Sequence, residues 1–315
     1  MGRPRRLVHI CLAMLGGTAL GAEPVLEVAP GQLRPGDALV VDLHVDGACP
    51  VAWIGARPLF FHPHRRRCRA LAGVPVELAT GDLPIRVGSV EAQRLIGPRM
   101  LAPTDAGSPH DGSPNATPEW PPVPLELPPA GAVEVLPAAF AQRELTVAPQ
   151  FIEPPPSVQL RMAEDRRAFA AAFAQPFLPP RFRKSFIWPR DSRITATFGD
   201  KRTFNGVQQS QHYGIDLDGQ VGAPIHAAND GVVVMVRDNY AAGRTVVIHH
   251  GLNLYTVYFH LSRFDVRQGQ SVKRGQLLGR VGQTGRVTGP HLHWGVRVGE
   301  LYVDPTSVLQ LDLER

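Results

Sequence analysis

Four histidines and one aspartate in the last third of the chain have the residue types of a metal-dependent active site. His291 and His293 are two residues apart, so on an extended chain their side chains point the same way, about 6–7 Å apart. His212, Asp216 and His260 precede them within the same C-terminal segment. Imidazole and carboxylate groups are ligands of Zn²⁺. We therefore expect these five residues to gather at one centre.

The spacing of His212 and Asp216 constrains the backbone between them. The two residues would align on a helix, but Gly214 and the residues after it oppose a helix. On a straight strand they would lie about 13 Å apart, too far to share one ion at about 2 Å. The chain must therefore bend, and Gly214 permits the bend. One of His291 and His293 would be the third ligand, which leaves a fourth position for water, as in catalytic zinc sites.

A water on zinc needs a proton acceptor, and the chain has no His-Glu-x-x-His motif that would supply a glutamate base. We expect a histidine to serve instead. Whichever of His291 and His293 is not a ligand, together with His260, would face the substrate and take the proton or stabilise the oxyanion. Three other histidines are interpreted as structural or surface residues: His226, His249 and His250.

The first residues have the pattern of an export signal, predicted over residues 1–22. Three arginines precede an apolar stretch over residues 7–20, which ends in two small residues. A membrane anchor is the weaker interpretation, because His9 and glycines interrupt a stretch that is short for about 30 Å of bilayer. We expect an exported protein with no membrane segment after cleavage, in the periplasm or alternatively outside the cell. Without Arg3, Arg5 and Arg6, the 33 basic side chains become 30 against 28 acidic ones, which does not indicate nucleic-acid binding.

Two cysteines remain once the signal is removed, Cys49 and Cys68. An even pair in an exported chain predicts a disulfide. Closing a loop of about 20 residues would stabilise the N-terminal domain by about 3 kcal/mol in the chain-entropy model. The alternative is a zinc site formed with His62 and His64, which an oxidising compartment disfavours.

Short alternating runs such as residues 39–45 predict an N-terminal β-domain over residues 23–153. A proline-rich insertion, about residues 103–129, interrupts it. The segments 133–135 and 144–147 are expected to resume strand pairing after this insertion.

Residues 154–185 are predicted to be a helical linker, with a helix from about residue 162 to 174 that carries Phe169 and Phe173 on one face. Glycines then separate β-rich runs with no competing helical pattern, as in residues 231–236 and 254–258. We expect a mainly β fold in which residues 186–315 form an antiparallel sheet folded on itself.

Short motifs follow one another in a characteristic order between Ile194 and Asp304. They are His212-x-Gly214-x-Asp216, Gly222-Ala223-Pro224-Ile225-x-Ala227-x-x-x-Gly231, Tyr258-x-His260-Leu261, Gly269-Gln270-x-Val272, Gly282-x-Thr284-Gly285 and Thr288-Gly289-Pro290-His291-Leu292-His293. In this order they resemble the lysostaphin/LytM-type zinc metallopeptidases, which cut peptide bonds in bacterial peptidoglycan. The resemblance covers about a third of the chain and implies the duplicated hybrid motif fold.

The resemblance also implies a role for each residue of the cluster. His212, Asp216 and His293 would hold one Zn²⁺ at the floor of a β-sheet groove, and His260 and His291 would be the catalytic pair. All five residues are present, whereas some relatives have lost ligands and only activate other wall hydrolases. We therefore expect an endopeptidase acting on peptidoglycan stem peptides or cross-links, which in a directly cross-linked wall would cut D-alanine from diaminopimelate.

Two other functions have some support in the sequence. A non-catalytic wall-binding or amidase-activating protein would share the domain, but the complete ligand set opposes it. A lipoyl- or biotinyl-type carrier would share the pattern around Lys273, but Lys273 lies in a strand repeat rather than at a modification hairpin. Phe259 departs from the small residue that many members carry there, so the preferred bond is left open.

Overall fold

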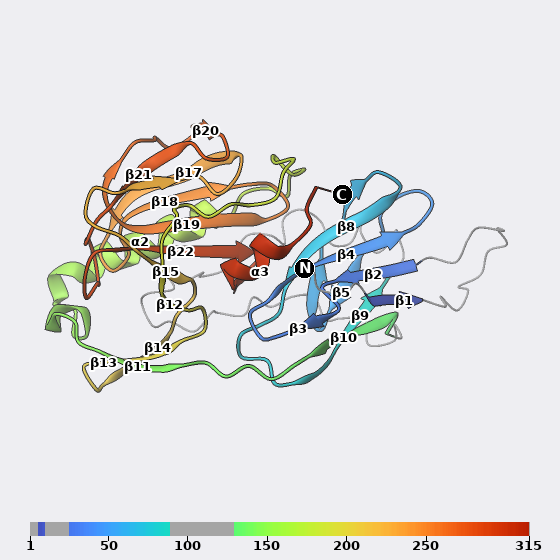
Figure 1. The fold of residues 1–315 in the computed structure, drawn as a ribbon, viewed down its shortest axis with the longest axis horizontal. Coiled ribbons are helices and arrows are strands. Elements are labelled where there is room, and N and C mark those ends of the chain that lie inside the picture. Colours follow the sequence, from blue (N-terminus) through green and yellow to red (C-terminus); the bar gives the residue numbers. More distant parts are fainter. Residues whose placement is uncertain (1–5, 10–24, 89–128, 315) are drawn as a thin grey trace. The chain divides into compact units, whose positions relative to one another are not determined.

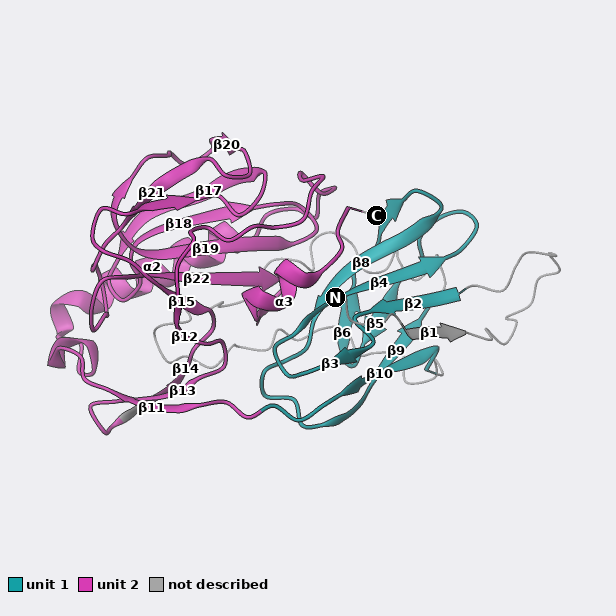
Figure 2. Cartoon of the chain, viewed as in Figure 1, with its two compact units in different colours: residues 1–101, 119–138 teal, residues 102–118, 139–315 magenta. Residues whose placement is uncertain are grey.

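The computed structural model describes residues 6–9, 25–88 and 129–314 (Figure 1). The chain divides into two compact units, drawn in teal and magenta in Figure 2. Unit 1 comprises Met1–Leu101 and Glu119–Ala138, and unit 2 comprises Ala102–Pro118 and Ala139–Arg315. Both units are built mainly of strands, so the predicted mainly β fold is confirmed. The domain limits expected from the sequence stay predictions.

Two segments expected from the sequence fall largely outside the described residues. Of the expected signal peptide, residues 1–22, only β1 (Arg6–His9) is described, and it pairs antiparallel with β2 (Val25–Ala29). The expected proline-rich insertion, about residues 103–129, lies outside the described residues as far as residue 128. None of the described helices is long and apolar enough to cross a membrane. The signal peptide therefore stays a prediction.

The described part of unit 1 consists of two five-stranded sheets around one apolar core. The first sheet has the order β1-β2-β4-β8-β7, with β4 (Ala38–His44), β7 (His62–His64) and β8 (Arg67–Gly73). The second has the order β3-β10-β9-β5-β6, with β3 (Gln32–Leu33), β5 (Ala52–Ile54), β6 (Arg57–Leu59), β9 (Gly81–Val87) and β10 (Gly131–Val135). Side chains of both sheets, among them Leu39 and Ile85, are fully buried in this core.

Cys49 and Cys68 form a disulfide with Cα atoms 5.5 Å apart. The predicted pairing is therefore present, and these sulfurs are not available for the alternative zinc site. Beside it, the buried Arg69 guanidinium donates two hydrogen bonds to Asp42, at 2.7 and 2.8 Å. Arg67 adds a second cation 3.1 Å from the same carboxylate, so the buried charge of Asp42 is compensated.

The two segments after the expected insertion pair in different units. β10 pairs antiparallel with β9, so the chain resumes the sheet that it left before the insertion. β11 (Gln142–Leu145) instead pairs in parallel with β13 (Lys201–Phe204) of unit 2. Residues 139–153 thus belong to the second compact unit, whereas the sequence places them in the N-terminal domain.

Unit 2 is dominated by one antiparallel sheet with the order β12-β15-β22-β19-β18-β17-β20, to which β16, β21 and β23 are attached. Its strands are β12 (Ile194–Ala196), β15 (Ile215–Asp218), β16 (Pro224–His226), β17 (Gly231–Asn239), β18 (Gly243–His249), β19 (Leu254–Phe264), β20 (Ser271–Val272), β21 (Leu277–Val281), β22 (His291–Val298) and β23 (Leu301–Val303). A smaller sheet joins β11, β13 and β14 (Gln208–Gln211). The strands predicted from the glycine-separated runs are therefore present.

The predicted helix is α2 (Pro156–Phe173), which starts earlier than expected because proline fits the first turn of a helix. It packs on the sheet of unit 2: the Phe169 ring contacts Phe259 and the Phe173 ring contacts Tyr255, with centroids 5.8 and 5.3 Å apart. The buried Asp165 accepts a hydrogen bond from Arg237 of β17. The helix is thus grouped with unit 2, and the helical linker over residues 154–185 stays a prediction.

A second helix was not expected from the sequence. α3 (Pro305–Gln310) follows β23, and the Asp304 carboxylate caps it by accepting a hydrogen bond from the Thr306 backbone N–H at 2.8 Å. The Asp304-Pro305 pair is the signal that the strand-rich pattern obscured, since aspartate at the N-cap and proline at the first position typically begin a helix.

Candidate metal centre

The structure brings His212, Asp216 and His293 together at the centre of the large sheet. Asp216 on β15 is the direct cross-strand partner of His293 on β22, so the two side chains share one face of the sheet. His212 precedes β15, and the chain bends at Gly214 between them. All three residues are buried. They are the only group of three or more potential ligands from histidine, cysteine, aspartate and glutamate found in the described parts of the chain.

Gly214 has a steric role in addition to the bend expected from the sequence. A Cβ atom at this position would lie 2.6 Å from Cε1 and Nε2 of His293, and 2.8 Å from the Trp294 carbonyl oxygen. These distances are too short for any side chain. Glycine therefore leaves the space that the His293 ring occupies.

The three candidate ligand atoms form a nearly equilateral triangle. His212 Nε2 lies 3.0 Å from Asp216 Oδ1 and 2.9 Å from His293 Nδ1, and His293 Nδ1 lies 3.0 Å from Asp216 Oδ1. Around tetrahedral zinc with bonds of about 2.0–2.1 Å, ligand atoms are about 3.3 Å apart. The two imidazoles and the carboxylate are also ligand types that zinc accepts. The triangle therefore fits one zinc ion with a fourth position open.

Each ligand is oriented by a second residue. The Nδ1–H of His212 donates to the Thr197 carbonyl oxygen at 2.7 Å, which leaves Nε2 as the atom directed at the triad. Arg202 of β13 donates from Nη2 to Asp216 Oδ2 at 2.7 Å, which leaves Oδ1 for the triad. The Phe259 ring stacks on His293, with centroids 5.1 Å apart and planes 10° apart.

The charges of the triad are shifted in the direction that metal binding requires. Burial opposes ionisation of Asp216, but His212, His293 and Arg202 together outweigh it and hold the pKa of the carboxyl well below its usual range. Burial lowers the pKa of His293 to about 4. A charged carboxylate and a neutral imidazole are the forms that bind a cation.

His260 and His291 lie beside the triad, with their ring centroids 5.0 Å apart. The Nδ1–H of His260 donates to the Thr284 carbonyl oxygen, and that of His291 to the Gly289 carbonyl oxygen, each at 2.8 Å. In both rings Nε2 is therefore the basic nitrogen. Burial, followed by His291 and His293, lowers the pKa of His260 well below its usual value, so this imidazole is neutral.

His260 occupies an unusual backbone position. Its φ angle is +66°, a left-handed conformation that is uncommon for a residue other than glycine and is often found at functional sites. The pairing of β19 with both β18 and β21 is irregular around this point. The bulge turns the His260 ring toward His291.

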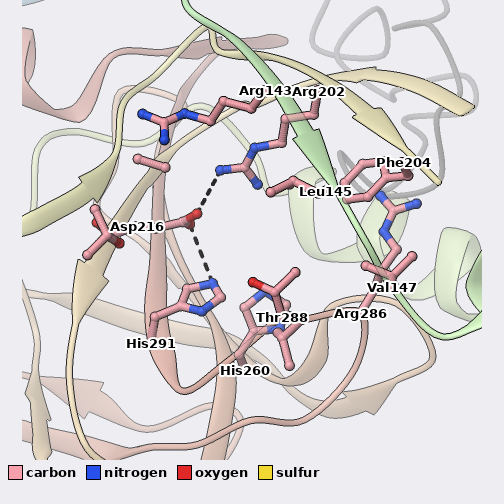
Figure 3. A pocket seen from close by; sticks show the side chains of 13 residues that line it. Arg143, Leu145, Val147, Arg202, Phe204, Asp216, His260, Arg286, Thr288 and His291 are labelled. Atoms are coloured by element: carbon pink, nitrogen blue, oxygen red, sulfur yellow. Dashed lines mark hydrogen bonds and ion pairs between the residues drawn. The ribbon is translucent and has the colours of Figure 1, made fainter. Parts of the chain in front are cut away.

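A pocket of about 170 Å³ opens beside these residues (Figure 3). Asp216, His260 and His291 form part of its wall, and His291 Nε2 lies 3.6 Å from Asp216 Oδ1. The other lining residues are Arg143, Leu145, Val147, Thr195, Ala196, Arg202, Phe204, Arg286, Val287 and Thr288. The five residues singled out in the sequence therefore meet, three as a ligand triangle and two over the adjoining pocket.

The sequence did not indicate the residues that complete this wall. Arg143, Leu145 and Val147 reach the pocket because β11 pairs with β13, more than fifty residues later in the chain. The Asn205 side chain fixes this segment by hydrogen bonds to both backbone groups of Val147, each at 2.9 Å. No local sequence pattern indicates such a pairing. Arg202, which also lines the pocket, stands ten residues before His212 and was the one visible signal in the sequence.

Residues 210–305 match the model of Peptidase family M23. Peptidoglycan DD-endopeptidase ShyA of Vibrio cholerae serotype O1 is 46% identical over 110 residues, which cover 34% of this chain and 26% of ShyA. DD-carboxypeptidase/endopeptidase Mpg of Neisseria meningitidis serogroup B is 42% identical over 117 residues, 37% of this chain and 27% of Mpg. The matched part thus spans about a quarter of the length of these relatives.

One solved structure is similar over most of the chain. A Pseudomonas aeruginosa protein assigned to peptidase M23 superposes with a TM-score of 0.58 and 25% identity, over 88% of this chain and 95% of that one. The ordered motifs, the ligand triangle and these similarities agree. The chain therefore carries a peptidase family M23 domain, which includes residues 210–305.

Proposed function

We propose that this chain is a zinc-dependent endopeptidase that hydrolyses the peptide cross-links or stem peptides of bacterial peptidoglycan. The observation that carries the proposal is the meeting of His212, Asp216 and His293 at ligand distances beside the histidine pair His260 and His291. The similarity to proteins named as peptidoglycan endopeptidases supports the substrate.

His212, Asp216 and His293 would hold one zinc ion. Bound there, zinc would polarise the scissile carbonyl group and activate a water molecule as the nucleophile. Asp216 supplies the negative charge, and the Arg202 hydrogen bond keeps its second oxygen away from the triad. The Thr197 carbonyl keeps the basic nitrogen of His212 directed inward.

His260 and His291 would move the proton. Both rings present a basic Nε2 to the same pocket, because a backbone carbonyl accepts the hydrogen on the opposite nitrogen of each ring. His260 is kept neutral by burial, so it can accept a proton or a hydrogen bond. His291 is the more exposed of the two, with 17% of its side chain accessible, and can exchange protons with solvent and the leaving amine.

The substrate bond that fits this proposal best is the amide between D-alanine and diaminopimelate in a directly cross-linked wall. The predicted signal peptide and the disulfide Cys49–Cys68 support an exported, periplasmic enzyme. Both relatives quoted above carry DD-peptidase names.

The first test is the zinc content of the mature protein together with mass-spectrometric analysis of its products from purified peptidoglycan. We expect stoichiometric zinc and cleaved cross-links from the wild type. Asp216→Ala should lose both, and His291→Ala should keep zinc and lose cleavage. Absence of zinc from the wild type would contradict the proposal and favour a wall-binding protein.

A further inference from the structure

The pocket beside the ligand triangle carries more positive than negative charge. Three arginines line it, Arg143, Arg202 and Arg286, and Asp216 is its one acidic lining residue among the described residues. Asp200, which is fully buried, forms an ion pair with Arg143 and balances that charge. Arg202 and Arg286 are the other two cations of the lining, and a divalent cation at the triad would add further positive charge.

Arg202 is placed to bind a second anion. Its side chain is only 11% exposed, and Nη2 donates to Asp216 Oδ2. Its Nε–H is also buried, and no acceptor lies within hydrogen-bond distance of it in the described parts of the chain. A buried donor of this kind is costly unless an acceptor arrives, and a carboxylate matches the planar guanidinium group best.

Arg286 brings a second guanidinium group to the same pocket (Figure 3). Its Cζ atom lies 4.5 Å from the centre of the Phe204 ring, and its backbone N–H donates to the Ala241 carbonyl oxygen at 2.7 Å. The residue is 6% exposed. The position of this cation is therefore fixed by packing before any ligand binds, which lowers the entropy cost of binding.

The pocket is larger than a nucleophilic water requires. Its volume is about 170 Å³, whereas one water molecule occupies about 30 Å³ in the liquid. Its lining includes Asp216 and the apolar side chains of Leu145 and Val147. Such a space accepts a small anionic group carried on an apolar carbon.

We propose that this pocket is a carboxylate subsite, in which Arg202 and Arg286 bind the free α-carboxylate of the residue that supplies the scissile nitrogen. The inference rests on the proposed peptidase function. In an amide between D-alanine and diaminopimelate, the carboxyl group of D-alanine forms the bond and carries no charge. The diaminopimelate carbon that bears the amide nitrogen keeps its own free carboxylate. The negative charge next to the scissile bond therefore belongs to the leaving amine.

The test compares two synthetic cross-link fragments that differ only at this group, as the free carboxylate or as the carboxamide. We expect wild-type enzyme to cleave the carboxylate form with a kcat/KM about 10- to 100-fold higher, the range that one lost hydrogen bond to a charged group gives. Arg286→Gln and Arg202→Gln should reduce this ratio to about 3-fold or less. Zinc content is measured for both variants, because Arg202 touches a metal ligand.

Arg193→Gln is the matched control, since Arg193 is 78% exposed, pairs with Asp218 and does not line the pocket. It changes the net charge equally and should leave the ratio unchanged. Binding of both fragments to zinc-loaded His260→Ala is measured in parallel by calorimetry, so that the subsite is tested without turnover. Equal binding of the two fragments would overturn the carboxylate subsite, whereas selective binding without any wild-type cleavage would overturn the peptidase proposal alone.

Discussion

The described part of unit 2 contains two groups of buried histidines, and only one of them is suited to catalysis. The site group meets at Asp216, whereas His249 and His250 lie at the end of β18 and just beyond it. Burial lowers the pKa of His250 to about 3 and that of His249 to about 4, and that of His293 also to about 4. A lowered pKa therefore does not distinguish the two groups.

The difference lies in what the second ring nitrogen meets. His250 donates from Nδ1 to the Asp230 carbonyl oxygen at 2.7 Å, and its Nε2 lies 2.8 Å from the neutral Thr256 hydroxyl. His212 also uses a backbone carbonyl on Nδ1, but its Nε2 meets Asp216 and His293. Convergence of ring nitrogens on a carboxylate, rather than burial, indicates the metal centre.

The largest expected difference between the two histidine groups is in zinc content and cleavage, and it is measured by comparing His293→Ala with His250→Ala. His293→Ala should remove zinc and reduce peptidoglycan cleavage by at least about 10⁴-fold, since both the cation and its activated water are lost. His250→Ala should keep zinc and cleave within about 3-fold of wild type below its melting temperature. It should be destabilised by about 2–4 kcal/mol, because a buried hydrogen-bonded ring is lost. Zinc analysis, digestion assays and thermal unfolding measure these effects, and loss of zinc from His250→Ala would contradict the comparison.

His260→Ala is expected to have the next largest effect. It should keep stoichiometric zinc, because His260 is not part of the ligand triangle, and lower turnover by about 10²- to 10⁴-fold, the usual contribution of a general acid or base. His226→Ala is the control, since His226 lies on β16 and does not line the pocket. Zinc content and initial rates on labelled peptidoglycan are measured for both. A zinc-free His260→Ala protein would assign this residue to metal binding instead.

Gly214→Ala should act on the metal centre without removing a ligand. The new methyl group would meet the His293 ring at 2.6 Å, so the ring must move and the zinc affinity should fall by about 10- to 100-fold, as when a supporting contact of a ligand is lost. The matched variant is Gly289→Ala, where a Cβ atom meets no heavy atom within 4 Å. Competition with a chelating zinc indicator measures both affinities. Equal affinities would show that the ring has room to adjust.

Much of this site was accessible from the sequence, because its residues lie in local motifs. The spacing of His212 and Asp216 required a bend, and the structure has the bend at Gly214. The two-residue spacing of His291 and His293 placed both on one face of β22, with one in the triangle and one at the pocket. Which of the two is the proposed ligand did not follow from spacing alone, and came from the family resemblance.

The parts that were missed depend on contacts between distant segments. β11 joins β13 in parallel, and a four-residue strand carries no signal of its partner. The helix α2 was expected, but its packing on Phe259 was not, because amphipathic spacing indicates a buried face and not what covers it. Phe169 meets Phe259 edge to face, and Phe259 stacks on His293, so these ring contacts link a segment outside the matched domain to a proposed ligand.

The smallest expected effect is the contribution of His250 to acid stability. Because the folded-state pKa of His250 is about 3 and the unfolded value is 6.5, the unfolded chain binds a proton between these values and the folded chain does not. This contribution is fully present above pH 6.5 and is lost as the pH falls toward 3, by at most about 1.4 kcal/mol per pH unit. His249 and the Asp230 carbonyl group face the ring and are unchanged in the comparison that follows.

The contribution of His250 to acid stability is measured by denaturant unfolding of wild type and His250→Gln at pH 7, 6 and 5, in the presence of a chelator. Glutamine keeps a donor and an acceptor at the same position but does not titrate. The stability difference in favour of the wild type should therefore shrink as the pH falls, by about 1.4 kcal/mol per pH unit below pH 6. A difference that stays constant from pH 7 to 5 would mean that His250 titrates alike in both states. The two histidine groups would then differ in their pKa values as well as in their partners.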